Sequence, residues 1–148
     1  MKFLPLDTSD KSKHLLQDFL DSAGASLVGF RYYNSRDFDV IKNHIFSFLL
    51  YDGEKCVGYG HLDREKEKVW LGICVRETCT GLGYGDIIMK KLISLHSGTI
   101  SLTVDSTNKA AINLYKKYNF EISSERRNIY LMKRKWYLFT SRFYPEKA

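Results

Sequence analysis

The chain has 148 residues, of which 44% are hydrophobic and 27% charged, ordinary values for a soluble globular protein. Its formal net charge of +6 favours anionic partners. We find no repeat, linker or low-complexity run, and no apolar run approaches the length that crosses a membrane. We therefore expect one domain over residues 1–148, with 136–148 as a tail of uncertain role, and no membrane partner.

The cysteines indicate a reducing compartment. Cys56, Cys74 and Cys79 are odd in number and lack the paired spacing of a metal site. We expect three reduced thiols, no bound metal and a cytoplasmic location.

The first half of the chain predicts mainly strands. Ser12–Ala23 is the main exception, because its leucines and Phe19 recur on one side of a helix. Asp52-Gly53 is a strong hairpin signal between two strand-like runs. The expected elements are, in order, a strand Lys2–Leu6, the helix Ser12–Ala23, an extended segment Leu27–Tyr33, a short helix Asp37–Asn43, and hairpin strands His44–Tyr51 and Lys55–Leu62.

The second half predicts alternating strands and helices. The expected elements are a strand Lys68–Val75, a helix Tyr84–His96, a strand Thr99–Val104, a helix Asn108–Tyr118, and a closing hairpin of Phe120–Glu125 with Asn128–Lys135. This order indicates a mixed α/β sheet with helices on its faces.

Glycines alternate with other residues at the turn between Val75 and the helix that follows. Gly81, Gly83 and Gly85 leave backbone N–H groups open at a helix N-terminus, where the helix dipole favours anions. The nucleoside-triphosphate loop and the dinucleotide fingerprint are both excluded, because Asp86 stands where each needs a glycine. The turn therefore predicts a different phosphate ligand, and the alternative is a glycine-rich turn with no ligand.

A second motif follows about two dozen residues later. Polar residues from Asp105 to Asn108 can cap a helix start, and the helix then places Ala111, Leu114, Tyr115 and Tyr118 on one face.

Together the two motifs resemble the GNAT superfamily of acyl-CoA-dependent N-acyltransferases, firmly over Val69–Phe120. The family loop reads roughly V-x-P-x-x-[RQ]-G-x-G-x-G and the later helix roughly N-x-x-A-x-x-L-Y-x-K-x-G-F. The matching residues are Val75, Gly81, Gly83 and Gly85 in the loop, and Asn108, Ala111, Leu114, Tyr115, Lys117 and Phe120 in the helix. Departures are Thr80 in place of Arg or Gln, Glu77 in place of proline, Asn119 in place of glycine, and the acidic Asp86.

The resemblance implies a GNAT-like mixed, mostly antiparallel central sheet with helices on both faces. It also implies acetyl-CoA as co-substrate, bound by a splayed strand and by the glycine loop. The implied cofactor-binding residues are Ile73 and Val75 for the pantetheine arm, Thr80, Gly81, Gly83, Tyr84 and Gly85 for the pyrophosphate, and Asn108, which contacts the arm or anchors its helix. Tyr115 would be the general acid at the sulfur.

The general base is less clearly indicated, since the splayed strand offers no carboxylate. His61 on the preceding strand is the candidate, because the ordinary pKa of histidine suits proton uptake near neutral pH. Alternatives are Asp63, Glu77 and His44, or an acceptor that arrives as the free amine.

For the acceptor, the sequence offers an aromatic and cationic set: Phe30, Arg31, Tyr32, Tyr33, Arg36, His44, Phe46 and Phe48. We expect acetyl transfer to a primary amine of a small molecule of amino acid or amino sugar type, by a monomer or homodimer. O-acylation stays open, as does a non-catalytic acyl-CoA-binding domain.

A basic nucleic-acid-binding domain is the third alternative, and we do not favour it. It would use Arg126, Arg127, Lys133, Arg134 and Lys135, with aromatic residues among them. The interpretation that we prefer is that Asn128–Lys135 forms a solvated sheet edge whose cationic side chains discourage pairing.

Overall fold

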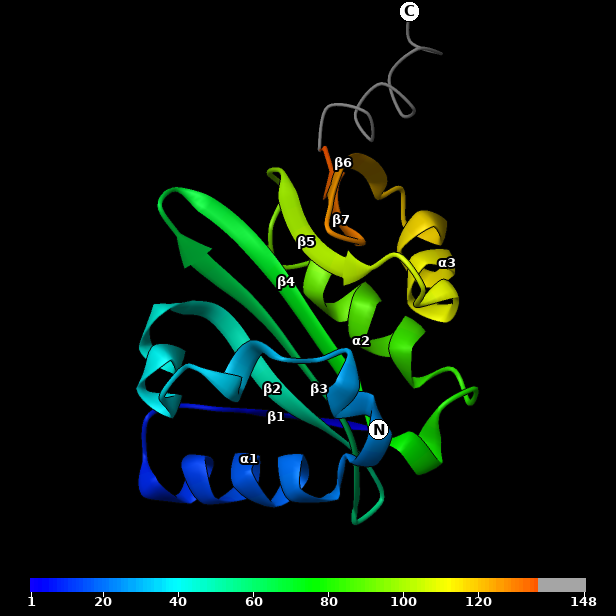
Figure 1. Ribbon diagram of the computed structural model, residues 1–148. Helices are drawn as coiled ribbons and strands as arrows, with labels where there is room; N and C mark the ends of the chain where they lie inside the picture. The colour runs from blue at the N-terminus through cyan, green and yellow to red at the C-terminus, as the bar shows by residue number, and fades with distance from the viewer. Residues whose placement is uncertain (136–148) are drawn as a thin grey trace, which may run out of the picture.

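The computed structural model describes residues 1–135, so the predicted tail lies outside the described residues. Seven strands form one sheet in the order β1-β2-β3-β4-β5-β7-β6 (Figure 1). All neighbouring pairs are antiparallel except β4 and β5. The strands are β1 (Lys2–Pro5), β2 (His44–Asp52), β3 (Lys55–Glu65), β4 (Lys68–Val75), β5 (Ile100–Asp105), β6 (Glu121–Arg126) and β7 (Ile129–Arg134). The predicted mixed, mostly antiparallel sheet is confirmed.

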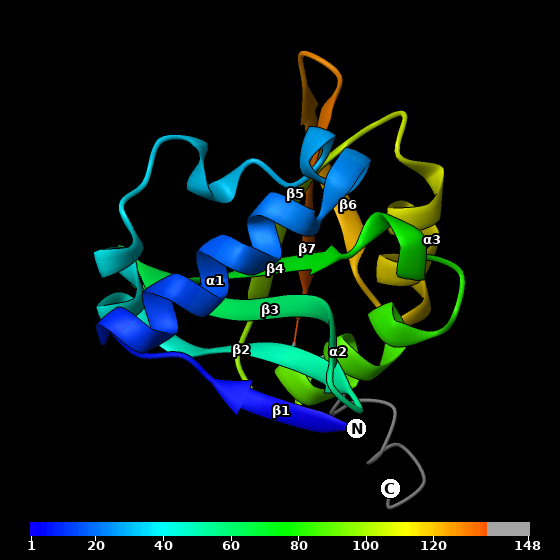
Figure 2. The ribbon, with the colours of Figure 1, turned by 90° about the horizontal axis from the view of Figure 1, so that it is seen from below.

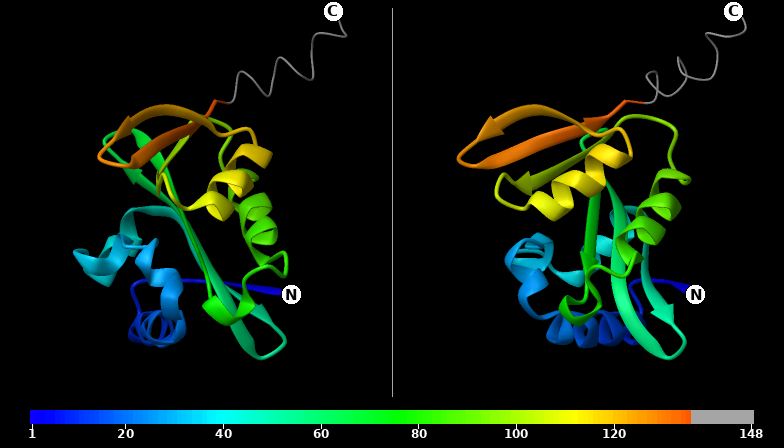
Figure 3. Two further views of the ribbon diagram at one scale, coloured as in Figure 1. Left: turned by 45° about the vertical axis from the view of Figure 1, so that its right-hand side comes forward. Right: turned by 90° about the vertical axis from the view of Figure 1, so that its right-hand side faces the viewer.

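Helices cover both faces of the sheet, as predicted (Figures 2 and 3). The Ser9 side chain caps the first helix, and Leu16 and Phe19 of that helix are buried against one face. On the opposite face Ile88 and Leu92 of the second helix are fully buried in a separate cluster. The helices are α1 (Asp10–Ser22), α2 (Tyr84–Ile93) and α3 (Lys109–Lys117).

The parallel contact between β4 and β5 is short. It consists of Val69 opposite Ile100 and Trp70 opposite Ser101, and beyond these pairs the two strands separate. Residues Leu71–Val75 of β4 therefore pair with β3 on one side only. Figure 3 shows the sheet opening along this line.

The predicted extended segment Leu27–Tyr33 is wrong. The chain instead forms 3-10 turns at Gly24–Val28 and Tyr32–Asn34. Aromatic packing explains this, because the rings of Phe30 and Tyr33 lie 5.6 and 5.8 Å from that of Tyr59 on β3. These turns carry aromatic side chains onto the face of the sheet that α1 covers.

Two further expectations are corrected. The helix predicted to reach His96 ends at Ile93, where the backbone N–H groups of Ser94 and Leu95 close the last turn. The segment Asn128–Lys135 is not a sheet edge, because β7 lies between β5 and β6. The edge strand at this end of the sheet is β6, all of whose residues are exposed.

Candidate active site

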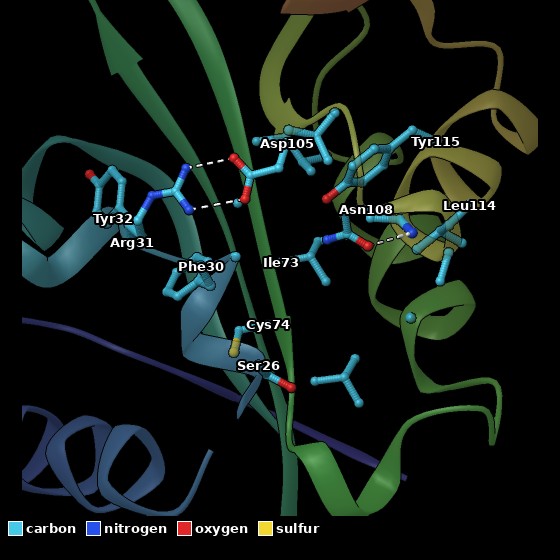
Figure 4. A pocket seen from close by; sticks show the side chains of 18 of the residues that line it. Ser26, Phe30, Arg31, Tyr32, Ile73, Cys74, Asp105, Asn108, Leu114 and Tyr115 are labelled. Carbon is cyan, nitrogen blue, oxygen red and sulfur yellow. Dashed lines mark hydrogen bonds and ion pairs between the residues drawn. The ribbon is translucent and has the colours of Figure 1, made fainter. Parts of the chain in front are cut away.

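A cavity of about 1070 Å³ occupies the opening between β4 and β5 (Figure 4). One wall, here called the loop side, consists of Thr80, Gly81, residues 83–86 and the start of α3. The facing wall, here called the aromatic side, is formed by Phe30, Tyr32, His61, Asp63 and Trp70.

The glycine loop supplies open backbone at the start of α2. Gly81 and Gly83 have φ angles of +78° and +89°, a conformation that favours glycine. A Cβ at either position would meet nothing within 4 Å, so both backbones face open space. Gly83 also gives α2 no side-chain cap, which leaves the first N–H groups of the helix free for an anion.

The side chains beside these glycines are held away from the backbone groups. Thr80 donates its hydroxyl to the Glu77 carbonyl at 3.0 Å, and Tyr84 bonds through its hydroxyl to Asp52 on the β2–β3 hairpin. Both residues line the cavity with Gly85, and only their main chains are available for a ligand at the loop.

Asp86, the acidic departure from the family motif, is paired. Its Oδ1 accepts from Lys117 Nζ at 2.6 Å and from the Tyr118 hydroxyl at 2.8 Å, both contributed by the chain around the end of α3. Those hydrogen bonds, that of Lys117 first, lower the pKa of the Asp86 carboxyl. The Lys117 ammonium group therefore compensates part of the negative charge that Asp86 places beside the loop.

We expect Lys117→Ala to weaken acetyl-CoA binding about fivefold, because Asp86 would then face the phosphates without its cationic partner. Titration calorimetry with acetyl-CoA measures the change. Lys116→Ala, at an exposed neighbouring position, is the matched control and should bind as the wild type does. Equal affinities for the two variants would contradict this account of Asp86.

Tyr115 points its hydroxyl into the cavity between the two walls (Figure 4). The residue is 8% exposed, and its ring packs 5.9 Å from that of Phe120. Burial raises the pKa of Tyr115 to about 12, so the hydroxyl keeps its proton near neutral pH. No residue within 1–135 forms a hydrogen bond with this hydroxyl, which leaves it free to donate to a ligand.

Asn108 anchors the start of α3. Its Oδ1 accepts from the Ala111 N–H at 3.2 Å, the cap that the sequence predicts. Its Nδ2 lies 3.4 Å from where a Cβ on Gly29 would stand, so the amide also faces the opposite wall.

An ion pair crosses the mouth of the cavity. Arg31 donates to both carboxylate oxygens of Asp105, at 2.8 and 3.0 Å, and also to the Val28 carbonyl. Asp105 ends β5, so the pair ties the turn segment on one side of the opening to the strand on the other (Figure 4). The positive charge that Arg31 was expected to offer an acceptor is engaged by this contact.

His61 lies on β3 directly opposite Gly72 of β4. A Cβ at position 72 would stand 2.4 Å from the His61 ring, so the ring fits there only because residue 72 is glycine. The Nδ1 atom lies 2.8 Å from the Tyr59 hydroxyl, which in turn lies 2.5 Å from that of Tyr33. Burial holds the pKa of His61 well below its usual value, so the ring is neutral near pH 7.

The other candidate bases are placed differently. Asp63 lines the cavity two residues beyond His61. Glu77 also lines it, but accepts from the Ala25 N–H at 2.9 Å. His44 does not line the cavity, and its Nε2 lies 2.9 Å from the Tyr32 hydroxyl.

The structure brings together most residues that the sequence singled out, but not all. Ile73 and Val75 line the cavity from the open side of β4. Phe46 and Phe48 belong to the core on the α2 face and take no part in the site.

The sequence analysis did not identify two residues of the site. Trp70 was missed, because only the β3–β4 register places it opposite Asp63. Asp105 was assigned only to the helix cap, and nothing in the sequence indicates its contact with Arg31.

Within residues 1–135, no three His, Cys, Asp or Glu side chains gather as a metal ion would require. None of the helices over the same residues is both long enough and apolar enough to cross a membrane.

The profile of the acetyltransferase (GNAT) family matches residues 13–120. The chain belongs to this family. It is 31% identical over 100 residues to the uncharacterized N-acetyltransferase YjcF of Bacillus subtilis, a match that covers 61% of this chain and 66%, just under two thirds, of YjcF.

Solved structures share the GNAT fold. The ribosomal-protein-S18-alanine N-acetyltransferase from Escherichia coli has a TM-score of 0.70 at 19% identity, over 90% of this chain and 92% of that one. YncA from Salmonella typhimurium, a putative acetyltransferase solved with its cofactor acetyl-CoA, has a TM-score of 0.68 at 12% identity, over 92% and 95%. The fold expected from the resemblance is therefore confirmed.

Proposed function

We propose that this GNAT protein transfers an acetyl group from acetyl-CoA to a primary amine of a small molecule, of amino acid or amino sugar type. The observation that carries the proposal is one cavity with open loop amides on one wall and the Tyr115 hydroxyl directed into it. We assign residues 1–148 to one such domain in the cytoplasm, where Cys56, Cys74 and Cys79 would stay reduced.

Acetyl-CoA would bind to two parts of the backbone that the fold leaves unpaired, one on β4 and one in the glycine loop. The main chain of Ile73 and Val75, on the side of β4 that β5 does not pair, would hold the pantetheine arm. The amides of the loop from Thr80 to Gly85, together with the α2 N-terminus, would hold the pyrophosphate. Asn108 would face the arm from the start of α3.

The chemistry needs one proton removed from the amine and one given to the leaving thiolate. Tyr115 holds its proton near neutral pH and would donate it at the sulfur. His61 is neutral, and would accept the amine proton at a ring nitrogen. Because burial makes His61 a weak base, proton removal is the more demanding of the two steps.

A thermal shift tests cofactor binding. A ligand at one hundred times its dissociation constant should add about 2.7 kcal/mol to the free energy of unfolding. We expect acetyl-CoA and CoA to stabilise the protein, and ATP at matched ionic strength to have no effect. The absence of any shift with millimolar acetyl-CoA would overturn the proposal.

A non-catalytic acyl-CoA-binding domain is the second candidate, favoured by the weak basicity of His61. It predicts the same thermal shift but no release of CoA thiol when amines are added. Thiol release with a panel of small primary amines therefore separates the two functions.

A further inference from the structure

Asp63 is a buried carboxylate on the aromatic side of the cavity. The residue is 4% exposed and lines the cavity wall. Its Oδ2 accepts from the Tyr32 hydroxyl at 2.6 Å, whereas its Oδ1 has no hydrogen-bond partner among residues 1–135. Oδ1 is not among the fully enclosed side-chain atoms, so it opens onto the cavity, where a ligand that donates hydrogen bonds can reach it.

The histidines near Asp63 do not compensate its charge. The Tyr32 hydroxyl has one proton, which goes to Asp63 because a carboxylate only accepts. The hydroxyl oxygen of Tyr32 therefore accepts a hydrogen bond from Nε2–H of His44 at 2.9 Å. Burial lowers the pKa of His44 to about 4, and that of His61 well below its usual value. Both rings are neutral near pH 7.

The arginines do not compensate it either. Arg31 is bound to Asp105. Arg36 is exposed, with its guanidinium 4.3 Å from the Tyr32 ring centre and a hydrogen bond to the Tyr32 carbonyl at 3.0 Å. It lowers the pKa of both histidines, so its field reaches the cluster, but water screens an exposed charge. No ion pair joins Asp63 to any residue within 1–135.

Aromatic rings line the wall around this carboxylate. Trp70 lies opposite Asp63 in the β3–β4 register, and Phe30 and Tyr32 line the same part of the cavity. Aromatic faces attract cations, and a carboxylate beside them selects an ammonium over an anion.

Strand geometry sets the distance to the reacting centre. His61 and Gly72 lie where β4 and β5 have separated, whereas Asp63 lies opposite Trp70, the last β4 residue that pairs with β5. Asp63 is two residues from His61, which corresponds to about 7 Å along the strand.

We propose that Asp63 binds a second cationic group of the acceptor, about 7 Å from the amine that reacts. The acceptor class is then a small linear diamine, or another primary amine that carries a second ammonium. This inference rests on the proposed function, acetyl transfer to a primary amine of a small molecule, and replaces the amino acid or amino sugar type given there with a dicationic amine.

Three isosteric amines test the proposal, with thiol release as the readout. Putrescine has a second ammonium group, and n-pentylamine has a methyl group in its place. γ-Aminobutyrate has carboxylate oxygens at the same position along the chain. We expect kcat/KM to be at least ~30-fold higher for putrescine than for n-pentylamine, and lowest for γ-aminobutyrate. Asp63→Asn should reduce the putrescine preference to within about threefold, through KM rather than kcat. Glu125→Gln, which neutralises an exposed carboxylate on β6 that does not line the cavity, should keep the preference.

Calorimetric titration of putrescine into the CoA-saturated protein needs no turnover. Binding that Asp63→Asn abolishes would support the site even if no amine were acetylated, a result that would overturn only the enzymatic function. Equal use of putrescine and n-pentylamine by an active enzyme would overturn the inference and leave the function intact. If Asp63→Asn lowered kcat equally for all three amines, Asp63 would be the general base. That result would also overturn the inference. Should that variant fail to fold, the comparison of amines with the wild-type protein decides alone.

Discussion

Tyr115→Phe is expected to lower kcat by about 10²- to 10⁴-fold while the dissociation constant of acetyl-CoA changes less than about twofold. The substitution removes one hydroxyl, which faces the cavity, and keeps the ring that packs against Phe120. Steady-state thiol release gives kcat, and calorimetry gives the affinity.

Tyr130→Phe is the matched control for this variant. Tyr130 packs against the same core from β7 but does not line the cavity, so its loss of a hydroxyl should leave kcat unchanged. Full turnover in Tyr115→Phe would rule out its role as the general acid. A parallel loss of acetyl-CoA affinity would instead make Tyr115 a binding residue.

Gly83→Ala is expected to weaken acetyl-CoA binding by at least ~10-fold, since the added methyl group would project where the pyrophosphate should approach. Alanine at the +89° φ angle of Gly83 also costs about 1 kcal/mol of folding stability, because the left-handed conformation brings Cβ too close to the carbonyl oxygen. Urea unfolding measures the stability, and calorimetry the affinity.

Gly53→Ala separates these two effects. Gly53 has a φ angle of +63°, a Cβ there would also meet nothing within 4 Å, and it lies in the β2–β3 turn away from the cavity. This variant should lose a similar amount of stability and keep its affinity. If both variants bind acetyl-CoA like the wild type, the loop does not hold the phosphates.

The features that the sequence predicted well are those fixed by neighbouring residues. Gly81 and Gly83 have the positive φ angles that their turn requires, and Asn108 caps the helix that its position indicated. The Asp52-Gly53 turn also joins the two predicted strands, because glycine there adopts a conformation that other residues avoid. Such signals depend only on backbone chemistry over a few residues.

The features that escaped prediction depend on contacts between distant parts of the chain. Leu27–Tyr33 is not extended, because packing on Tyr59 of β3 overrides its local pattern. The partner of Asp86 is Lys117, thirty-one residues away, and no local pattern announces it. Likewise, only the β3–β4 register places Trp70 beside Asp63.

The short contact between β4 and β5 makes the sheet mechanically two parts, β1–β4 and β5–β7–β6, joined by two residue pairs. Their relative position then depends on α2, on the Asp86–Lys117 contact between helices, and on the Arg31–Asp105 pair at the mouth. A molecule lying between the strands would act as the missing strand and stiffen this joint. A ligand bound in the cavity would therefore make the two parts of the sheet unfold together, and the cooperativity of unfolding would rise.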